Sequence, residues 1–391
     1  MMKLLIFALL TSFLIITCDS ANIDENEPVT QILMPELTGD GWEVASLNSA
    51  GLNETKFKEL INRLNTTSNH RIHSILVARH GKLVFEKYYP GAKFNLGQFT
   101  GEYGYSINDL HVLCSATKSI TSALLGIAMD LGYIQSVDQK VFDFFPEYSS
   151  ILSESPSKGN MTIKHLLTMT SGLTYDDESL PYTDSRNDMT RFFVSSDPIG
   201  FLLSKPLFAE PGTVFDYDNC NTNILGRIIS KAVNKRIDQF AAEFLFGKLG
   251  IRQCEWQIVR GDVILCSGDL HLRPRDMAKF GQLFLNNGIW EGEDVISSGW
   301  CGISTSASLN PNNYNNEFTW AGGYGYQWWQ KTFYSGSKSY PSYFAAGWGG
   351  QHIFIIPSLN MIIVTTAGNW YDPEIISPFT IVSDYIIPSV K

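Results

Sequence analysis

The chain of 391 residues has no excess of positive charge: 29 Lys and Arg stand against 39 Asp and Glu, a net charge of −10. A chain this acidic, with no basic run, is poorly suited to a phosphate backbone. Its hydrophobic share of 44% and charged share of 17% are in the globular range rather than the disordered one. We therefore expect a globular protein that does not bind nucleic acid.

The sequence also lacks the motifs of several enzyme classes. It has no G-x-S-x-G turn of an α/β-hydrolase, no H-E-x-x-H metal motif, no P-loop and no dinucleotide fingerprint. His70 and His73 form an H-x-x-H pair, but no carboxylate pattern accompanies them, so a core or surface position is favoured over a metal site. We expect no metal and no cofactor.

No apolar run reaches the 18 residues typical of a membrane-spanning helix. The run Leu4–Ile16 is shorter and follows Met1–Met2–Lys3, a pattern typical of a secretory signal peptide. We expect residues 1–21 to be that signal and the protein to be secreted or periplasmic. Cys18 offers an alternative, a cell-envelope lipoprotein anchored to the membrane through lipid on this residue, although Thr17 is large for the position before it.

Removal of the signal would leave five cysteines, an odd number. Cys254 and Cys266 lie close in sequence and could form a disulfide in an oxidising compartment. The favoured interpretation of all five is nevertheless that of small buried side chains, and their spacings match no zinc site.

Apolar periodicity predicts helices over 52–66, 114–133, 162–169, 220–247 and 274–287. It also predicts a hairpin around His80–Gly81 and strands over 352–356 and 361–366. Strands at both ends with helices between them favour an α+β fold. We expect a leader over 22–50, a discontinuous sheet domain over 51–139 and 290–391, and an inserted, mostly helical domain over 140–289.

The first chemical motif is Ser115–Ala116–Thr117–Lys118, an S-x-x-K sequence at the head of an apolar helix. Residues i and i+3 share one helix face, so the Ser hydroxyl is expected beside the Lys amine. A Lys in a dry pocket has a lowered pKa and can accept the hydroxyl proton. Ser115–x–x–Lys118 therefore predicts an activated nucleophile.

Two further segments can complete such a site. Tyr217–Asp218–Asn219 is a Y-x-N motif, in which a phenol can relay protons and an amide can hold a carbonyl substrate. The Gly-rich segment 345–351 leads into a strand, where the backbone can approach a ligand closely.

In this order the motifs resemble the serine β-lactamase and penicillin-binding-protein superfamily, in particular its class C-like, esterase-like serine hydrolases. The matching stretches are 113–126, 161–173, 210–226, 270–285 and 343–366. The resemblance implies an antiparallel sheet formed by both ends of the chain, with flanking helices. It implies that Ser115 is the acyl-accepting nucleophile, Lys118 its base, Tyr217 a second acid/base and Asn219 a donor to the acyl side.

In the register we prefer, the resemblance places the third family motif at Trp348–Gly349–Gly350. It thereby assigns Trp348, Gly350 and Gln351 to substrate binding, with the backbone N–H groups of Ser115 and Gln351 as oxyanion donors. A register shifted to 345–347 would move the second donor to Trp348.

Neither register supplies the family's Lys or His at the first position of the motif. This favours a small ester or amide substrate over a β-lactam or a peptide with a terminal carboxylate, although Arg186 could replace the cation. β-Lactamase or D,D-carboxypeptidase activity, and a non-catalytic ligand-binding role, remain the alternatives.

Overall fold

The computed structural model describes residues 32–95, 98–314, 318–370 and 376–391. The chain from Leu33 to Lys391 forms one compact unit. The predicted signal peptide and Cys18 lie outside the described residues. Within those residues, no helix is both long enough and apolar enough to cross a membrane.

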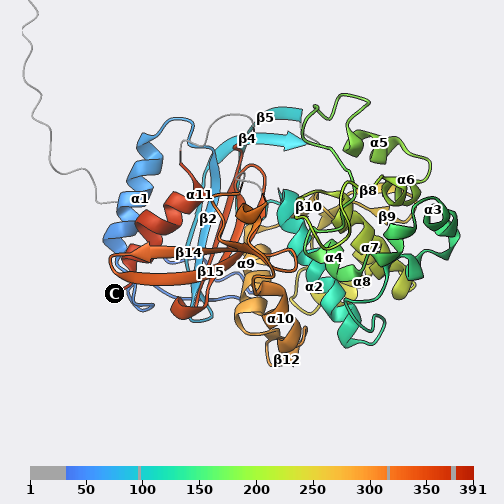
Figure 1. Ribbon diagram of the computed structural model, residues 1–391. Helices are drawn as coiled ribbons and strands as arrows, with labels where there is room; N and C mark the ends of the chain where they lie inside the picture. Colours follow the sequence, from blue (N-terminus) through green and yellow to red (C-terminus); the bar gives the residue numbers. More distant parts are fainter. Residues whose placement is uncertain (1–31, 96–97, 315–317, 371–375) are drawn as a thin grey trace, which may run out of the picture. The chain divides into compact units, whose positions relative to one another are not determined.

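One large sheet is built from both ends of this unit (Figure 1). All neighbouring strands are antiparallel except the first pair, which is parallel. In spatial order the strands are β1 (Glu43–Val44), β3 (Lys82–Tyr88), β2 (Ile72–Arg79), β17 (Met361–Ala367), β16 (Gln351–Ile356), β15 (Lys338–Gly347), β14 (Trp329–Ser335) and β13 (Gly323–Tyr324). The predicted α+β fold and the sheet formed by both ends are confirmed.

The centre of the sheet is covered on both faces. Every residue of β16 and β17 is buried, which explains their continuous apolar sequences. The β2–β3 hairpin was predicted, and its turn residues His80 and Gly81 have φ angles of 54° and 76°. Two positive φ values in a two-residue loop match the right-handed twist of the flanking strands.

The chain between the two groups of strands is mainly helical. Its helices are α2 (Thr117–Asp130), α3 (Ser149–Glu154), α4 (Ile163–Leu167), α5 (Asp188–Val194), α6 (Pro198–Ser204), α7 (Cys220–Ala232), α8 (Ile237–Ala241), α9 (Pro274–Leu285) and α10 (Ser298–Thr305). In Figure 1, α3, α4, α6, α7 and α8 gather away from the large sheet. The predicted helix over 220–247 is two helices followed by a wide turn at Ala242–Phe246.

Two groups of helices cover the sheet itself. Helix α9 packs on β16 and β17, where Gly281 allows close approach, because a Cβ there would lie 2.8 Å from Ile362 and 2.9 Å from Ile353. Helix α1 (Glu54–Thr66) packs on the terminal segment formed by α11 (Pro378–Thr380) and the turns over 381–389. Phe57 of α1 contacts Phe85 of β3. Helix α1 and the C-terminal segment therefore pack together against the sheet.

Small sheets complete the fold. Three strands, β6 (His111–Val112), β10 (Leu270–Leu272) and β7 (Glu255–Trp256), pair beside the start of α2. The remaining pairs are β4 (Pro90–Asn95) with β5 (Gln98–Gly104), β8 (Ile258–Arg260) with β9 (Val263–Ile264), and β11 (Ile289–Trp290) with β12 (Glu293–Asp294).

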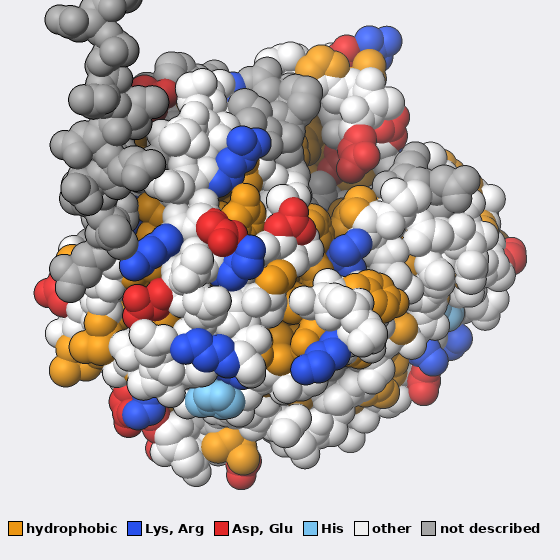
Figure 2. All heavy atoms as spheres, turned by 90° about the vertical axis from the view of Figure 1, so that its left-hand side faces the viewer, with side chains coloured by type: hydrophobic (Ala, Val, Ile, Leu, Met, Phe, Trp, Pro, Cys, Tyr) orange, Lys and Arg blue, Asp and Glu red, His pale blue; other side chains and the backbone are white. Residues whose placement is uncertain are grey.

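Part of the predicted leader contributes to the sheet. Glu43–Val44 forms β1, and Trp42 is buried with its indole N–H donated to the carbonyl oxygen of Arg275. On the face shown in Figure 2, basic and acidic side chains are interspersed. Lys82 of β3 and Glu43 of β1 form an ion pair.

The cysteines do not pair as the sequence allowed. Cys114, Cys220, Cys254, Cys266 and Cys301 are all free thiols, so the bridge that the sequence allowed between Cys254 and Cys266 does not form. The favoured interpretation of five small buried side chains holds for Cys220, Cys266 and Cys301 but is wrong for Cys254, which is exposed. Cys266 is enclosed against α7, where a Cβ on Gly226 would lie 2.0 Å from its Sγ, whereas Cys254 is exposed. Nearness in sequence did not bring these two side chains to one place.

Candidate active site

Ser115 lies in a tight turn that joins the small sheet to α2. The turn Cys114–Ala116 is a single 3-10 turn, and Cys114 has a φ of 46°, a left-handed conformation that is unusual for a residue other than glycine. The end of β15 presses on this turn, since a Cβ on Gly347 would lie only 2.0 Å from the carbonyl oxygen of Leu113. The large sheet therefore fixes the position of Ser115.

Lys118 lies one helical turn further on, with only 1% of its surface exposed. Its Nζ is 3.0 Å from Ser115 Oγ, 2.5 Å from Asn219 Oδ1 and 3.1 Å from the carbonyl oxygen of Ser267. Burial lowers the pKa of Lys118 to about 8, although the nearby carboxylate of Asp177 acts in the opposite direction. About one tenth of the amine is therefore neutral at pH 7, far more than for a lysine with an ordinary pKa.

Tyr217 lies beside Ser115, whose side chain acts to lower the phenol pKa, and the Tyr217 ring centroid is 4.9 Å from Lys118 Nζ. Phe318, Tyr324 and Trp329 pack around the phenol ring. Burial raises the pKa of Tyr217 well above its usual value. The phenol therefore stays protonated, and its role is that of a donor or proton relay rather than a phenolate base.

Asn219 immediately precedes α7 and is held at both ends of its amide. Its Oδ1 accepts from Lys118, and its Nδ2 donates to the carboxylate of Asp177. Asp177 is 6% exposed, and burial raises its pKa, while the hydrogen bond from Asn219 and the charge of Lys118 counteract that rise. The resemblance made Asn219 an acyl-side donor; in this structure one of its two N–H groups is already engaged.

Sequence reasoning missed Asp177 and Ser267, which complete the surroundings of Lys118. Asp177 follows the predicted helix-and-turn stretch 161–173 by four residues, and no spacing rule points to it. Ser267 is held by Asn223 of α7, which donates to the Ser267 hydroxyl and accepts from its backbone N–H. This clamp directs the Ser267 carbonyl to Lys118.

The structure does not support the preferred register of the third motif. Gln351 is 1% exposed, and its side chain exchanges hydrogen bonds with the backbone of Ala367 on β17. Neither Gln351 nor Gly350 lines the cavity beside Ser115, whereas Trp348 does. Because Gly347 is the residue that meets the Ser115 turn, the geometry favours the shifted register at 345–347.

A cavity of about 480 Å³ opens beside Ser115. Asn219 and Ser267 contribute polar groups to it, and most of the wall is apolar: Met189, Phe193, Val194, Leu265, Trp348 and Trp370. None of the described residues that line it is Lys or Arg. Arg186, considered above as a replacement cation, is exposed, paired with Asp184 and absent from this lining.

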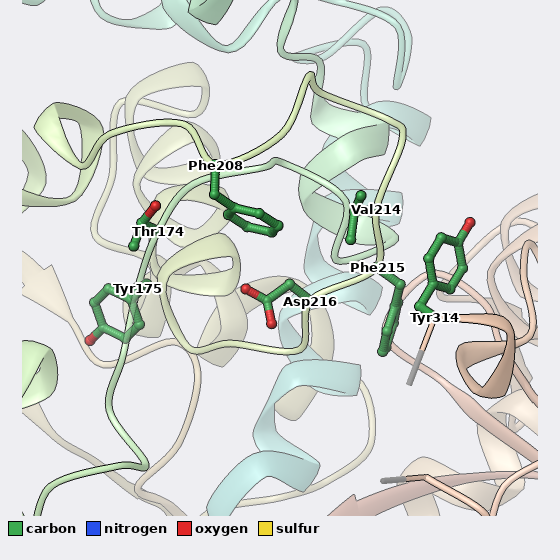
Figure 3. Close-up of a pocket in the computed structure, with 7 residues that line it drawn as sticks. All are labelled: Thr174, Tyr175, Phe208, Val214, Phe215, Asp216 and Tyr314. Carbon is green, nitrogen blue, oxygen red and sulfur yellow. The ribbon is translucent and has the colours of Figure 1, made fainter. Parts of the chain in front are cut away.

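A second cavity, of about 360 Å³, lies where Phe215 and Asp216 pass Phe208 and Tyr175 (Figure 3). Ser115, Lys118 and Tyr217 do not line it. Across the parts of the chain that the structure describes, no group of three or more His, Cys, Asp or Glu side chains could hold a metal ion. The candidate nucleophile Ser115 therefore belongs to the first cavity, and Lys118 contacts it from the buried side.

Residues 57–374 match the family model described as Beta-lactamase. The chain belongs to this family. It is a serine hydrolase of the β-lactamase-like type, and the resemblance inferred from the motifs is confirmed.

Known proteins similar to this β-lactamase-like chain include hydrolases of amides and esters. A 6-aminohexanoate-dimer hydrolase from Paenarthrobacter ureafaciens is 25% identical over 282 residues, 69% of each chain. The structure of a putative 6-aminohexanoate-dimer hydrolase from Bacillus anthracis is 22% identical, with a TM-score of 0.63 over 87% of this chain and 86% of that one. A family VIII carboxylesterase is 16% identical, also with a TM-score of 0.63, over 86% of this chain and 97% of that one. These two structural likenesses show the fold.

Proposed function

We propose that this protein hydrolyses a small ester or amide through a covalent acyl-enzyme on Ser115. The observation that carries the proposal is the 3.0 Å contact between Ser115 Oγ and Lys118 Nζ, together with the burial that lowers the pKa of Lys118 to about 8. A base with a pKa near the working pH combines availability with driving force for proton transfer.

In the proposed reaction, neutral Lys118 accepts the proton of Ser115 as Oγ attacks the substrate carbonyl carbon. The bond from that carbon to the leaving oxygen or nitrogen then breaks, and Tyr217 relays a proton to the leaving group. Water next attacks the acyl carbon, and its proton passes back through Lys118 while Ser115 is released. The products are a carboxylic acid and an alcohol or amine.

The developing oxyanion needs two donors. The backbone N–H groups of Ser115 and Trp348 are the pair that the shifted register supplies. This assignment is supported by the contact of Gly347 with the Ser115 turn and by the position of Trp348 on the cavity wall.

The lining of the cavity supports a substrate without a carboxylate near the reacting bond. A β-lactam or a peptide terminus would bring a carboxylate into the cavity. None of the described residues that line the cavity is a Lys or Arg that could pair with that carboxylate. Burial of an unpaired charge is costly, so an ester or amide that lacks this group is favoured. The activities of two similar proteins, a 6-aminohexanoate-dimer hydrolase and a carboxylesterase, support the same choice.

We also propose that the protein is exported, on the strength of the apolar run Leu4–Ile16 behind Lys3. The mass of the protein recovered from outside the producing cell tests this. A chain that begins near residue 22 indicates ordinary signal cleavage, and a lipid-modified chain that begins at Cys18 indicates membrane anchoring. Retention of residues 1–21 inside the cell would overturn the proposal.

Acylation followed by intact-mass spectrometry tests the catalytic proposal. Residues 22–391 would be incubated separately with p-nitrophenyl butyrate, a cephalosporin and a fluorophosphonate, with Ser115→Ala as the matched control. We expect ester turnover and a fluorophosphonate adduct, both abolished in Ser115→Ala. A stable cephalosporin adduct without ester turnover would favour a penicillin-binding protein, and no adduct with any probe would favour a non-catalytic binding protein.

A further inference from the structure

The second cavity, which does not contain the candidate nucleophile, combines aromatic rings with one charge. Four of the seven described residues that line it are aromatic: Tyr175, Phe208, Phe215 and Tyr314. Asp216 is the one charged side chain among those seven residues. In the view of Figure 3, its carboxylate lies between the Tyr175 and Phe215 side chains, with Phe208 above it. The cavity therefore presents a negative charge and several ring faces to one ligand.

Backbone hydrogen bonds hold the walls of this cavity in place. The N–H of Phe208 donates to the carbonyl oxygen of Gly172 at 2.9 Å, and the N–H of Asp216 donates to that of Met169 at 2.8 Å. The Phe215 side chain is buried. The cavity is thus formed before a ligand arrives, which lowers the cost of ordering its side chains on binding.

The electrostatic surroundings of the cavity favour a cation. Burial raises the pKa of Asp218, and the carboxylate of Asp216 acts in the same direction, which shows its negative field. None of the described residues that line the cavity is Lys or Arg. The face of an aromatic ring also carries negative charge, so the rings and the carboxylate attract the same kind of ligand.

The kind of cation follows from the hydrogen-bonding groups on the walls. A primary ammonium is strongly hydrated and needs acceptors for three N–H donors. The ring faces supply none, and the Tyr175 hydroxyl already donates to Sδ of Met189. A quaternary ammonium has no N–H donor, so ring faces and one carboxylate suit it better. The cavity volume of about 360 Å³ is in the usual range for small-molecule sites.

We propose that the second cavity binds a small quaternary ammonium ion of the size of choline, held by the charge of Asp216 and by the faces of Phe208, Phe215 and Tyr314. Phe208 and Tyr314 are partly exposed, so the ion can enter from solvent. The site is separate from the catalytic cavity, because the two cavities share no described lining residue. It requires no catalysis at Ser115.

Calorimetry with three ligands tests the proposed site. Choline carries the quaternary ammonium, 3,3-dimethyl-1-butanol has the same shape without the charge, and ethanolamine carries a primary ammonium. We expect choline to bind with a Kd of about 1 mM or below, and about tenfold more tightly than either analogue. Equal binding of the three ligands, tighter binding of ethanolamine, or no binding of choline at about 10 mM would overturn the inference.

Two variants assign the binding to the cavity walls. Asp216→Asn keeps the shape and removes the charge, and Phe208→Leu keeps an apolar side chain and removes the ring. Phe208 is 48% exposed, so this change should leave the fold intact. Each variant should weaken choline binding by about tenfold and leave binding of the neutral analogue unchanged.

The matched controls are Asp294→Asn and Tyr334→Leu, which make the same kinds of change at exposed residues that do not line the cavity. Both should bind choline as the unmodified protein does. Choline affinity that is unchanged in Asp216→Asn and in Phe208→Leu would overturn the assignment.

A last comparison separates this site from the proposed catalysis. Choline affinity should be the same in Ser115→Ala and in protein labelled at Ser115 with a fluorophosphonate, which fills the catalytic cavity. Loss of choline binding on labelling would place the ligand in the catalytic cavity and overturn the separate site. The measurement on Ser115→Ala needs no turnover, so its result holds even if the protein hydrolyses no ester.

Discussion

The protonation of Lys118 should control the rate of acylation, and the structure gives the pH at which it does so. Only the neutral amine can accept the Ser115 proton, and burial lowers the Lys118 pKa to about 8. With that pKa, about one tenth of Lys118 is neutral at pH 7 and about nine tenths at pH 9. We therefore expect kcat/KM to rise about tenfold between pH 7 and pH 9 and to level off above it.

A lysine with an ordinary pKa would behave differently. With the unperturbed value of 10.5, its neutral fraction would still rise about tenfold for each pH unit between 7 and 10. The assay is p-nitrophenyl butyrate hydrolysis from pH 6 to pH 10, with the Ser115→Ala rate subtracted at each pH to remove spontaneous hydrolysis. A constant rate over this range, or a tenfold rise per unit that continues to pH 10, would refute the reasoning.

Lys118→Arg gives the matching control for this titration. A guanidinium keeps its proton throughout the accessible pH range, so it preserves the positive charge but cannot act as the base. We expect this variant to lose activity at every pH rather than to shift the profile. A shifted but otherwise intact profile would mean that the titrating group is not Lys118.

Three further changes test the neighbours of the base. Asp177→Asn removes a charge that raises the Lys118 pKa, and its amide oxygen can still accept a hydrogen bond from Asn219. The pH at which kcat/KM is half-maximal should therefore fall below that of the unmodified protein. An unchanged midpoint would mean that the Asp177 charge does not affect the Lys118 pKa. Gly347→Ala places a Cβ 2.0 Å from the Leu113 carbonyl oxygen, so the Ser115 turn must shift. We expect the rate of fluorophosphonate labelling to fall by about tenfold or more while the circular dichroism spectrum stays unchanged. An unchanged labelling rate would mean that the Ser115 turn tolerates the displacement. Tyr217→Phe removes the proton relay to the leaving group. The hydrolysis rate of an alkyl ester should therefore fall further than that of a p-nitrophenyl ester, whose leaving group needs no proton. Equal losses of rate would assign Tyr217 another role.

The features that followed from the sequence are those set by local spacing. Ser115 and Lys118 are three residues apart at a helix start, so their contact depends on a single turn of backbone. The β2–β3 hairpin likewise follows from a two-residue turn at His80–Gly81 between apolar runs. In both cases the interacting groups are separated by only a few residues.

The register of the third motif could not be derived in this way. The segment 345–351 offered two registers, one that ends at Gly347 and one that ends at Gly350. The choice depends on which glycine meets the Leu113 carbonyl, a contact between residues more than 200 positions apart. The Cys254–Cys266 bridge failed for the converse reason: proximity in sequence does not fix the direction of two side chains.

The orientation of Asn219 shows how a distant residue can set the chemistry of a recognisable motif. From the sequence alone, the two ends of its amide are equivalent. Lys118 supplies donors at one end and the Asp177 carboxylate supplies acceptors at the other. Rotating the amide would place NH₂ against the ammonium and the oxygen against the carboxylate, losing both hydrogen bonds. Asn219 is therefore fixed as an acceptor from Lys118, and only its second N–H can reach an acyl group.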